Sequence, residues 1–61
     1  MKYVIAFYGK NGMGYAKSLD DSTDCIDEAM WFDTRQEAEC WIPDLENEWE
    51  GTKFRVVEVE V

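Results

Sequence analysis

Two apolar segments separated by a short turn sequence predict a β-hairpin at the start of the chain. Residues 2–8 (KYVIAFY) are rich in β-branched and aromatic side chains and are apolar on both faces, which is typical of a central strand. Residues 13–19 (MGYAKSL) predict a second, weaker strand. Between them lies Asn11-Gly12, a dipeptide that tolerates the positive φ angles of a tight turn. We therefore expect the two strands to pair.

The turn region, residues 9–14 (GKNGMG), has three glycines around a lysine, as phosphate-binding loops do. A Walker A loop needs four residues between its first glycine and Gly-Lys-Ser/Thr, and a dinucleotide-binding loop needs G-x-G-x-x-G. Both connect a strand to a helix. Here the order is G-x-x-G-x-G, and the next segment is predicted to be a strand. We interpret the region as a hairpin turn and expect no cofactor.

The middle of the chain is harder to assign. Residues 20–27 (DDSTDCID) are acidic and polar, so we expect a loop. Residues 28–32 (EAMWF) are too short for their period to be informative, and two alternatives stay open: a brief edge strand or an apolar plug before the helix. An EF-hand starting at Asp20 would need glycine and glutamate where the chain has Cys25 and Trp31. We expect no metal site.

A helix is predicted to begin at a capping box, in which Thr34 is the N-cap and Glu37 its partner; Asp33 is the alternative cap. Pro43 lacks a backbone donor, so the helix either kinks there or ends one residue earlier and restarts. Gly51 is expected to end it. The apolar face has the spacing i, i+3, i+4, i+7, i+11: Ala38, Trp41, Ile42, Leu45 and Trp49.

Residues 52–61 (TKFRVVEVEV) alternate and predict a final strand. One face would carry Arg55, Val57, Val59 and Val61, and the other Phe54, Val56, Glu58 and Glu60. The expected fold is one compact α+β domain, residues 1–61. Its single-layer sheet would have three or four strands, antiparallel or mixed, with the helix packed on one face.

Charge restricts the possible partners. The 61 residues include 14 acidic and 6 basic side chains, a net charge of −8. This density repels a phosphate backbone, so we expect no direct binding to nucleic acid. It favours a basic protein partner, such as the DNA-facing surface of a nucleic-acid enzyme. Because the chain is near the lower length limit for independent folding, we also expect a homodimer that buries more surface.

The sequence does not predict an enzyme. Cys25 and Cys40 do not have zinc-site spacing, and the chain has no histidine to bind a metal or activate a thiol. A domain this small has little volume for a substrate pocket. We interpret the cysteines as reduced thiols of a cytoplasmic protein, with a single disulfide as the less favoured alternative. The first apolar run, residues 3–8 (YVIAFY), is too short for the core of a signal peptide, so we expect none. No apolar run approaches the roughly 20 residues of a membrane helix.

Aromatic residues suggest binding to a protein. Nine of the 61 residues are Phe, Trp or Tyr, more than one helix face and one sheet face can bury. Tyrosine and tryptophan dominate the energetics of protein interfaces. We therefore predict a partner-binding patch of aromatic side chains rimmed by carboxylates. Its residues are Trp31, Tyr15, Trp49, Glu46, Glu48 and Glu50.

Two segments, FDTRQEAECWI at residues 32–42 and FRVVEVEV at residues 54–61, resemble short accessory proteins of tailed phages and prophages. In these proteins a hairpin precedes an F-x-T-x-x-E-A helix and a final valine/glutamate strand. The resemblance covers nearly the whole chain and implies a role in phage–host conflict. Such small acidic proteins often inhibit a host enzyme or a defence system, including restriction, CRISPR, Gabija, Thoeris and Hachiman systems.

Together, these observations predict a non-enzymatic, phage-encoded inhibitor that occludes a protein in the host cytoplasm. Two alternatives stay open. One is a DNA mimic, whose carboxylates imitate phosphates in the basic cleft of a nucleic-acid enzyme. The other is a small structural or assembly protein.

Overall fold

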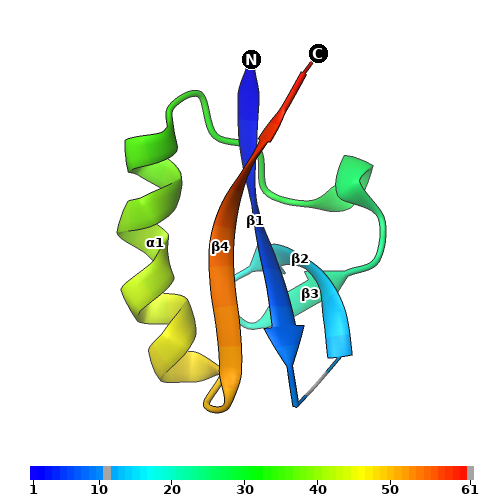
Figure 1. The fold of residues 1–61 in the computed structure, drawn as a ribbon, viewed down its shortest axis with the longest axis vertical. Helices are drawn as coiled ribbons and strands as arrows, with labels where there is room; N and C mark the ends of the chain where they lie inside the picture. The colour runs from blue at the N-terminus through cyan, green and yellow to red at the C-terminus, as the bar shows by residue number, and fades with distance from the viewer. Residues whose placement is uncertain (11, 61) are drawn as a thin grey trace.

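The computed structural model describes residues 1–10 and 12–60 (Figure 1). Its elements are β1 (Lys2–Gly9), β2 (Gly12–Ser18), β3 (Asp21–Thr23), the 3-10 helix η1 (Ile26–Glu28), α1 (Arg35–Glu48) and β4 (Thr52–Val59). The strands form an antiparallel sheet with the order β3-β2-β1-β4, and α1 packs against β4 and β1. The predicted α+β fold, with the first strand in a central position, is confirmed. Val61, predicted to belong to the last strand, lies outside the described residues.

The hairpin forms where the sequence predicts it, and Gly9 pairs with Gly12 at its end. Both glycines have positive φ angles, 145° and 99°, which side chains with a Cβ rarely adopt. Asn11, the centre of the predicted turn, lies outside the described residues. A Cβ on Gly9 would approach the carbonyl oxygen of Gly51 to 2.8 Å, so the absence of a side chain lets the hairpin lie against the turn before β4.

Residues 20–27 are not wholly a loop, and this prediction is wrong in part. They contain the short strand β3 and the beginning of η1. β3 pairs with β2, where Thr23 opposes Tyr15. Three polar residues have no apolar period, so local sequence gave no signal for this strand. Its hydrogen bonds depend on β2 as a neighbour.

Residues 28–32 act as the apolar plug, one of the two alternatives left open. Ala29 and Phe32 are buried, at 7% and 8% exposure. Phe32 makes an isolated bridge to Tyr3 of β1, with backbone hydrogen bonds of 2.9 and 2.8 Å. The segment therefore closes one end of the core without forming a strand.

The helix begins at the predicted capping box. The hydroxyl oxygen of Thr34 accepts a hydrogen bond from the backbone N–H of Glu37 at 3.2 Å. The helix continues across Pro43, so the alternative in which it ends one residue earlier is wrong. Trp49 is the C-cap, and Gly51, with φ 82°, lies in the turn to β4.

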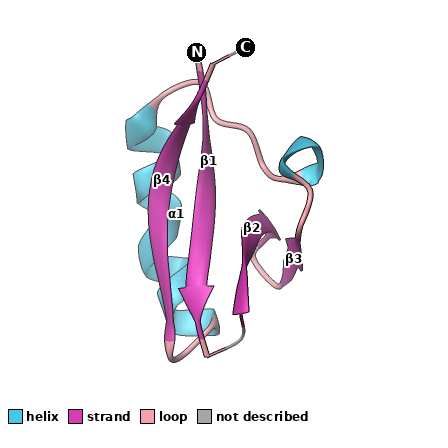
Figure 2. Cartoon of the chain, turned by 45° about the vertical axis from the view of Figure 1, so that its right-hand side comes forward, coloured by secondary structure: helices cyan, strands magenta, loops and turns pink. Residues whose placement is uncertain are grey.

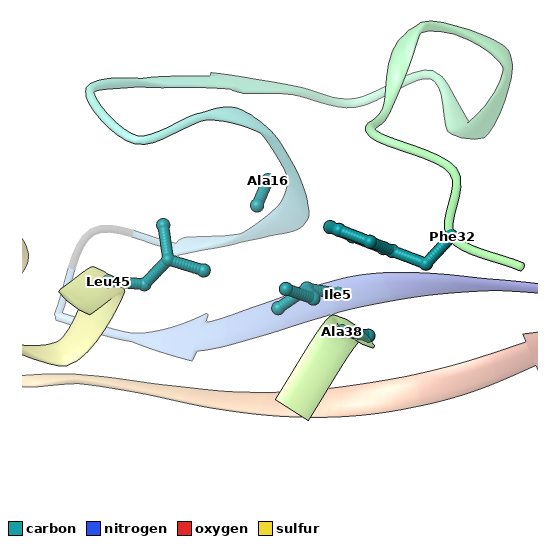
Figure 3. Packing of buried hydrophobic residues seen from close by; sticks show 5 residues of the cluster. All are labelled: Ile5, Ala16, Phe32, Ala38 and Leu45. Carbon is teal, nitrogen blue, oxygen red and sulfur yellow. The ribbon is translucent and has the colours of Figure 1, made fainter. Parts of the chain in front are cut away.

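A hydrophobic core lies between α1 and the sheet. Its buried residues are Ile5, Ala16, Phe32, Ala38 and Leu45, shown in Figure 3. Ile5 and Ala38 are fully buried, and Leu45 is 1% exposed. Of the remaining residues in the predicted helical stripe, Ile42 and Trp49 pack against this core, whereas Trp41 lies at its margin and is 37% exposed. The helical period thus predicted the buried face well, with Trp41 at its edge.

Candidate functional site

The helical segment carries most of the net charge of the protein. Residues 33–50 contain seven carboxylates and one basic residue, which gives −6 of the total −8. The carboxylates are Asp33, Glu37, Glu39, Asp44, Glu46, Glu48 and Glu50. The basic residue, Arg35, is itself paired with Glu39, with 3.8 Å between Nη1 and Oε2. Negative charge therefore dominates the outer surface of α1.

Three predicted site residues, Glu46, Glu48 and Glu50, are exposed at and just beyond the C-terminal end of α1. None makes an ion pair within the described part of the chain. The last turn of the helix has no basic residue, and the helix dipole places further partial negative charge at this end. These carboxylates are therefore available to a cationic group from another molecule.

Trp49, also predicted to contact a partner, is used inside the protein. Its ring stacks on Phe7, with 6.5 Å between ring centroids and an interplanar angle of 18°. Its Nε1–H donates to the carbonyl oxygen of Leu19 at 2.9 Å. The structure thus places Trp49 in the packing beneath the glutamates, with its indole donor already satisfied.

The aromatic residue exposed beside the carboxylates is Trp41, which the sequence assigned to the core stripe. Residues 37, 41, 44 and 48 share one helical face at the spacing i, i+4, i+7, i+11. Glu37, Asp44 and Glu48 therefore surround Trp41 along α1. The ring of Trp41 also lies 6.3 Å from that of Phe32, which fixes one side of it. The exposed fraction of Trp41 identifies it as a surface residue, which helical periodicity alone could not do.

Tyr15 and Trp31 lie on the face of the sheet that α1 does not cover. Tyr15 opposes Ala6 on β1, and the next residue, Ile5, points into the core, so alternation places Tyr15 on the opposite face. Trp31 is half-buried and precedes the core residue Phe32 in an extended segment, so it falls on the same face as Tyr15. The predicted patch is therefore divided: two of its aromatics lie opposite its glutamates.

The other candidate surface is the side of the sheet that α1 does not cover, which we call the open face; it is accessible beyond Val4, which alternation places on this side and which is fully buried. In Figure 2, β1 and β4 lie in front of α1, and no helix of the described residues crosses them. A hollow of about 610 Å³ lies on this face. Its lining includes Ala6, Tyr8, Met13, Tyr15, Arg55 and Val57, together with Asp24 just after β3. The sequence placed Arg55 and Val57 on one face of the last strand but did not show that this face is open.

Other site chemistry is limited among residues 1–10 and 12–60. They contain no group of three or more carboxylates, cysteines or histidines placed to hold a metal ion. Neither described helix is long and apolar enough to cross a membrane. Cys25 and Cys40 are exposed, free thiols, so the alternative of a disulfide between them is not formed. A hydrogen bond from the Lys2 ammonium, and then its charge, lower the pKa of Asp33 from the ordinary value.

The chain was compared with protein-family models, with curated protein sequences and with solved structures, and none of these comparisons found a match. The acidic face of α1, by which we mean the exposed carboxylates Asp44, Glu46, Glu48 and Glu50, and the open face of the sheet are therefore interpreted from their own chemistry.

Proposed function

We propose that the protein is a non-enzymatic protein-binding module, a phage-encoded inhibitor that occludes a host protein such as a defence or nucleic-acid enzyme. The observation that supports this is the group of unpaired carboxylates at and just beyond the C-terminal end of α1. Asp44, Glu46, Glu48 and Glu50 are all exposed, and none has an ion-pair partner within the described residues. A partner with a basic surface would complement them.

The carboxylates of the acidic face orient the partner protein and accelerate its association, and Trp41 provides an apolar anchor. Complementary charge accelerates encounter and selects the register of two surfaces. Each exposed ion pair contributes only about 0.2–1 kcal/mol, so several carboxylates and an apolar contact must act together. An exposed tryptophan surrounded by polar groups is the kind of residue that dominates an interface. We therefore assign to Trp41 the partner-binding role that the sequence predicted for Trp49.

A DNA mimic is the second candidate. Asp44 and Glu48 follow the i, i+4 spacing within α1, which separates their Cα atoms by about 6 Å along the helix. Glu46 lies on another side of the helix, and Glu50 lies just beyond its end. The carboxylates therefore surround the C-terminal end of α1, and a basic nucleic-acid cleft would enclose them.

The proposal can be tested by counting phage plaques on hosts that carry single defence systems and express this chain. The native chain is expected to relieve at least one system. The triple variant Glu46→Gln, Glu48→Gln, Glu50→Gln is expected to lose this relief, because it removes three carboxylates of the acidic face. A control variant, Asp20→Asn, Asp27→Asn, Glu60→Gln, removes the same charge elsewhere and is expected to keep it.

Failure of the native chain against every system would reject the inhibitor and favour a structural or assembly role. Equal loss in both triple variants would show that net charge, not the acidic face, matters. The dependence of binding on salt concentration then distinguishes a DNA mimic from a protein that is anchored by Trp41. Raising salt from about 0.15 M to about 1 M should abolish binding by a DNA mimic, whereas binding anchored by Trp41 should persist and be lost in Trp41→Ala.

A further inference from the structure

The open face has a row of residues that extends across all four strands. Arg55 on β4 opposes Ala6 on β1, Ala6 opposes Tyr15 on β2, and Tyr15 opposes Thr23 on β3. Asp24 follows Thr23 directly. Arg55 and Asp24 therefore lie near opposite ends of one row, about 14 Å apart across three strand spacings.

The two charges at the ends of this row have no partner within the described residues. Arg55 and Asp24 are both exposed, both border the hollow, and neither makes an ion pair with residues 1–10 or 12–60. Of the other cations, Lys2 pairs with Asp33, Lys17 with Glu28 and Arg35 with Glu39, whereas Lys10 and Lys53 do not border the hollow and make no ion pair within the described residues. The hollow thus has one unpaired positive charge on one side and one unpaired negative charge on the other.

Between these charges the open face is apolar and uneven. Ala6, the smallest side chain of the row, lies next to Tyr15, the largest. In the neighbouring row, Tyr8 opposes Met13 on β2 and the exposed Lys53 on β4; Tyr8 and Met13 are 47% and 80% exposed. Val57 borders the hollow from β4. The face therefore offers a half-exposed ring at Tyr15 and a hollow beside it.

We propose that the open face binds a second copy of this chain in a two-fold symmetric dimer. When two sheets pack face to face, a two-fold axis parallel to the strands and between β1 and β2 reverses the order of the row. Arg55 of each copy then faces Asp24 of the other. Tyr15 of each copy enters the hollow above Ala6 of the other. Both contacts occur twice, once on each side of the axis.

A second copy fits this face better than a nucleic acid does. A two-fold interface needs complementary features on one surface, and the open face has both charge signs, a ring and a hollow. A single strand of nucleic acid could stack on Tyr8 and Tyr15, but its phosphates would meet Asp24 and a chain of net charge −8. A stable interface of about 800 Å² a side is roughly a fifth of the 4195 Å² surface of the chain.

The dimer leaves the acidic face of α1 uncovered, because α1 lies on the other side of the sheet. Dimerisation and the proposed inhibition therefore rest on different surfaces. A variant that fails to dimerise can still be tested for binding through α1. The two proposals can fail independently.

Sedimentation equilibrium of the full chain, from about 1 μM to about 1 mM, is expected to show monomer and dimer. Arg55→Glu and Asp24→Arg each place like charges opposite one another twice per dimer. Each variant alone is expected to raise the dimer Kd by at least about tenfold. An equimolar mixture of the two is expected to recover dimers, because every facing pair between the unlike chains again has opposite charges.

Lys10→Glu is the matched control, since it makes the same change in charge at the hairpin tip and is expected to leave the Kd within about threefold. If a charge reversal prevents folding, Ala6→Leu replaces it, because a larger side chain fills the hollow and should also weaken the dimer. A native chain that stays monomeric to about 1 mM overturns the proposal. The proposal is also overturned if the equimolar mixture of Arg55→Glu and Asp24→Arg stays monomeric, or if Ala6→Leu leaves the dimer Kd unchanged. A monomeric native chain that binds a single-stranded oligonucleotide would assign the face to nucleic acid.

Discussion

The indole N–H of Trp49 donates to the carbonyl oxygen of Leu19 at 2.9 Å and thereby joins the end of α1 to the loop after β2. The same ring stacks on Phe7 of β1. One side chain therefore connects the helix, the central strand and the hairpin at one end of the core. We therefore expect this tryptophan, which lies beside exposed glutamates, to contribute to stability.

Trp49→Phe is expected to keep the stacking on Phe7 but lose the hydrogen bond to Leu19. We expect a loss of about 1 kcal/mol in the free energy of unfolding, measured by urea titration with far-UV circular dichroism. Trp41→Phe is the matched control, since Trp41 is at the margin of the core and donates no described hydrogen bond. It should change stability by less than about 0.5 kcal/mol. Equal losses in the two variants would contradict the role assigned to Trp49.

Local signals predicted most of the fold. The hairpin of the first two strands, the helix start at Thr34 and the strand over residues 52–59 each depend on neighbours in sequence, and each is confirmed. β3 was missed because its three polar residues become a strand only when β2 lies beside them. Local sequence also could not establish whether Pro43 would break the helix or be accommodated.

The spatial arrangement of the candidate site residues could be predicted less well, because it depends on contacts between residues that are distant in sequence. Trp49 satisfied two rules at once, the apolar stripe of a helix and the preference of tryptophan for interfaces, and only the contact with Leu19 distinguishes them. The open face was missed for a related reason. Alternation shows which residues share a face of one strand, but the register between strands is needed to bring Arg55, Ala6 and Tyr15 into one row.

Gly14 is predicted to be needed for the packing of β2. It opposes Phe7, and a Cβ on Gly14 would lie 3.0 Å from Cζ of Phe7 and 2.9 Å from the carbonyl oxygen of Thr23. The second contact is with backbone, so it can be relieved only by moving β3. Gly14→Ala should therefore lower the free energy of unfolding by about 1–3 kcal/mol.

The measurement for Gly14→Ala is chemical unfolding, with amide hydrogen exchange to locate the change at β3. Met13→Ala, at the neighbouring residue with 80% exposure, should change stability by less than about 0.5 kcal/mol. Unaltered stability and unaltered exchange in Gly14→Ala would show that the contact with Thr23 does not restrict β2.

Asp33 is predicted to make stability depend on pH. The hydrogen bond from Lys2 lowers the pKa of Asp33 in the folded protein, so the unfolded chain binds a proton more readily. The stabilisation is therefore complete above the ordinary carboxyl pKa of about 3.9 and is lost as pH falls through the lowered value. The stability difference between the native chain and Asp33→Asn should shrink between neutral and strongly acidic pH.

Urea titrations of both proteins over this pH range would measure that difference. Asp44→Asn is the control, because Asp44 has no ion-pair partner within the described residues. About 1 M salt should reduce the effect of Asp33→Asn, since the pair with Lys2 is exposed. A difference that grows as pH falls would contradict the predicted direction.

Pro43 is predicted to weaken α1. It lies inside the helix and has no N–H to donate to the carbonyl oxygen of Glu39, one turn earlier. Pro43→Ala restores that donor and a favourable helix residue, for a gain of up to about 3 kcal/mol. The variant also frees the unfolded chain, which offsets about 0.4–1 kcal/mol. We expect a net increase of up to about 2 kcal/mol in the free energy of unfolding. Asp44→Ala, a substitution at the next residue, which is also exposed, is the control. A Pro43→Ala variant that is more stable but no longer relieves the defence system would show that the helix path imposed by proline positions the carboxylates after it. A variant that is less stable than the native chain would contradict the prediction and show that α1 accommodates Pro43 without the expected cost.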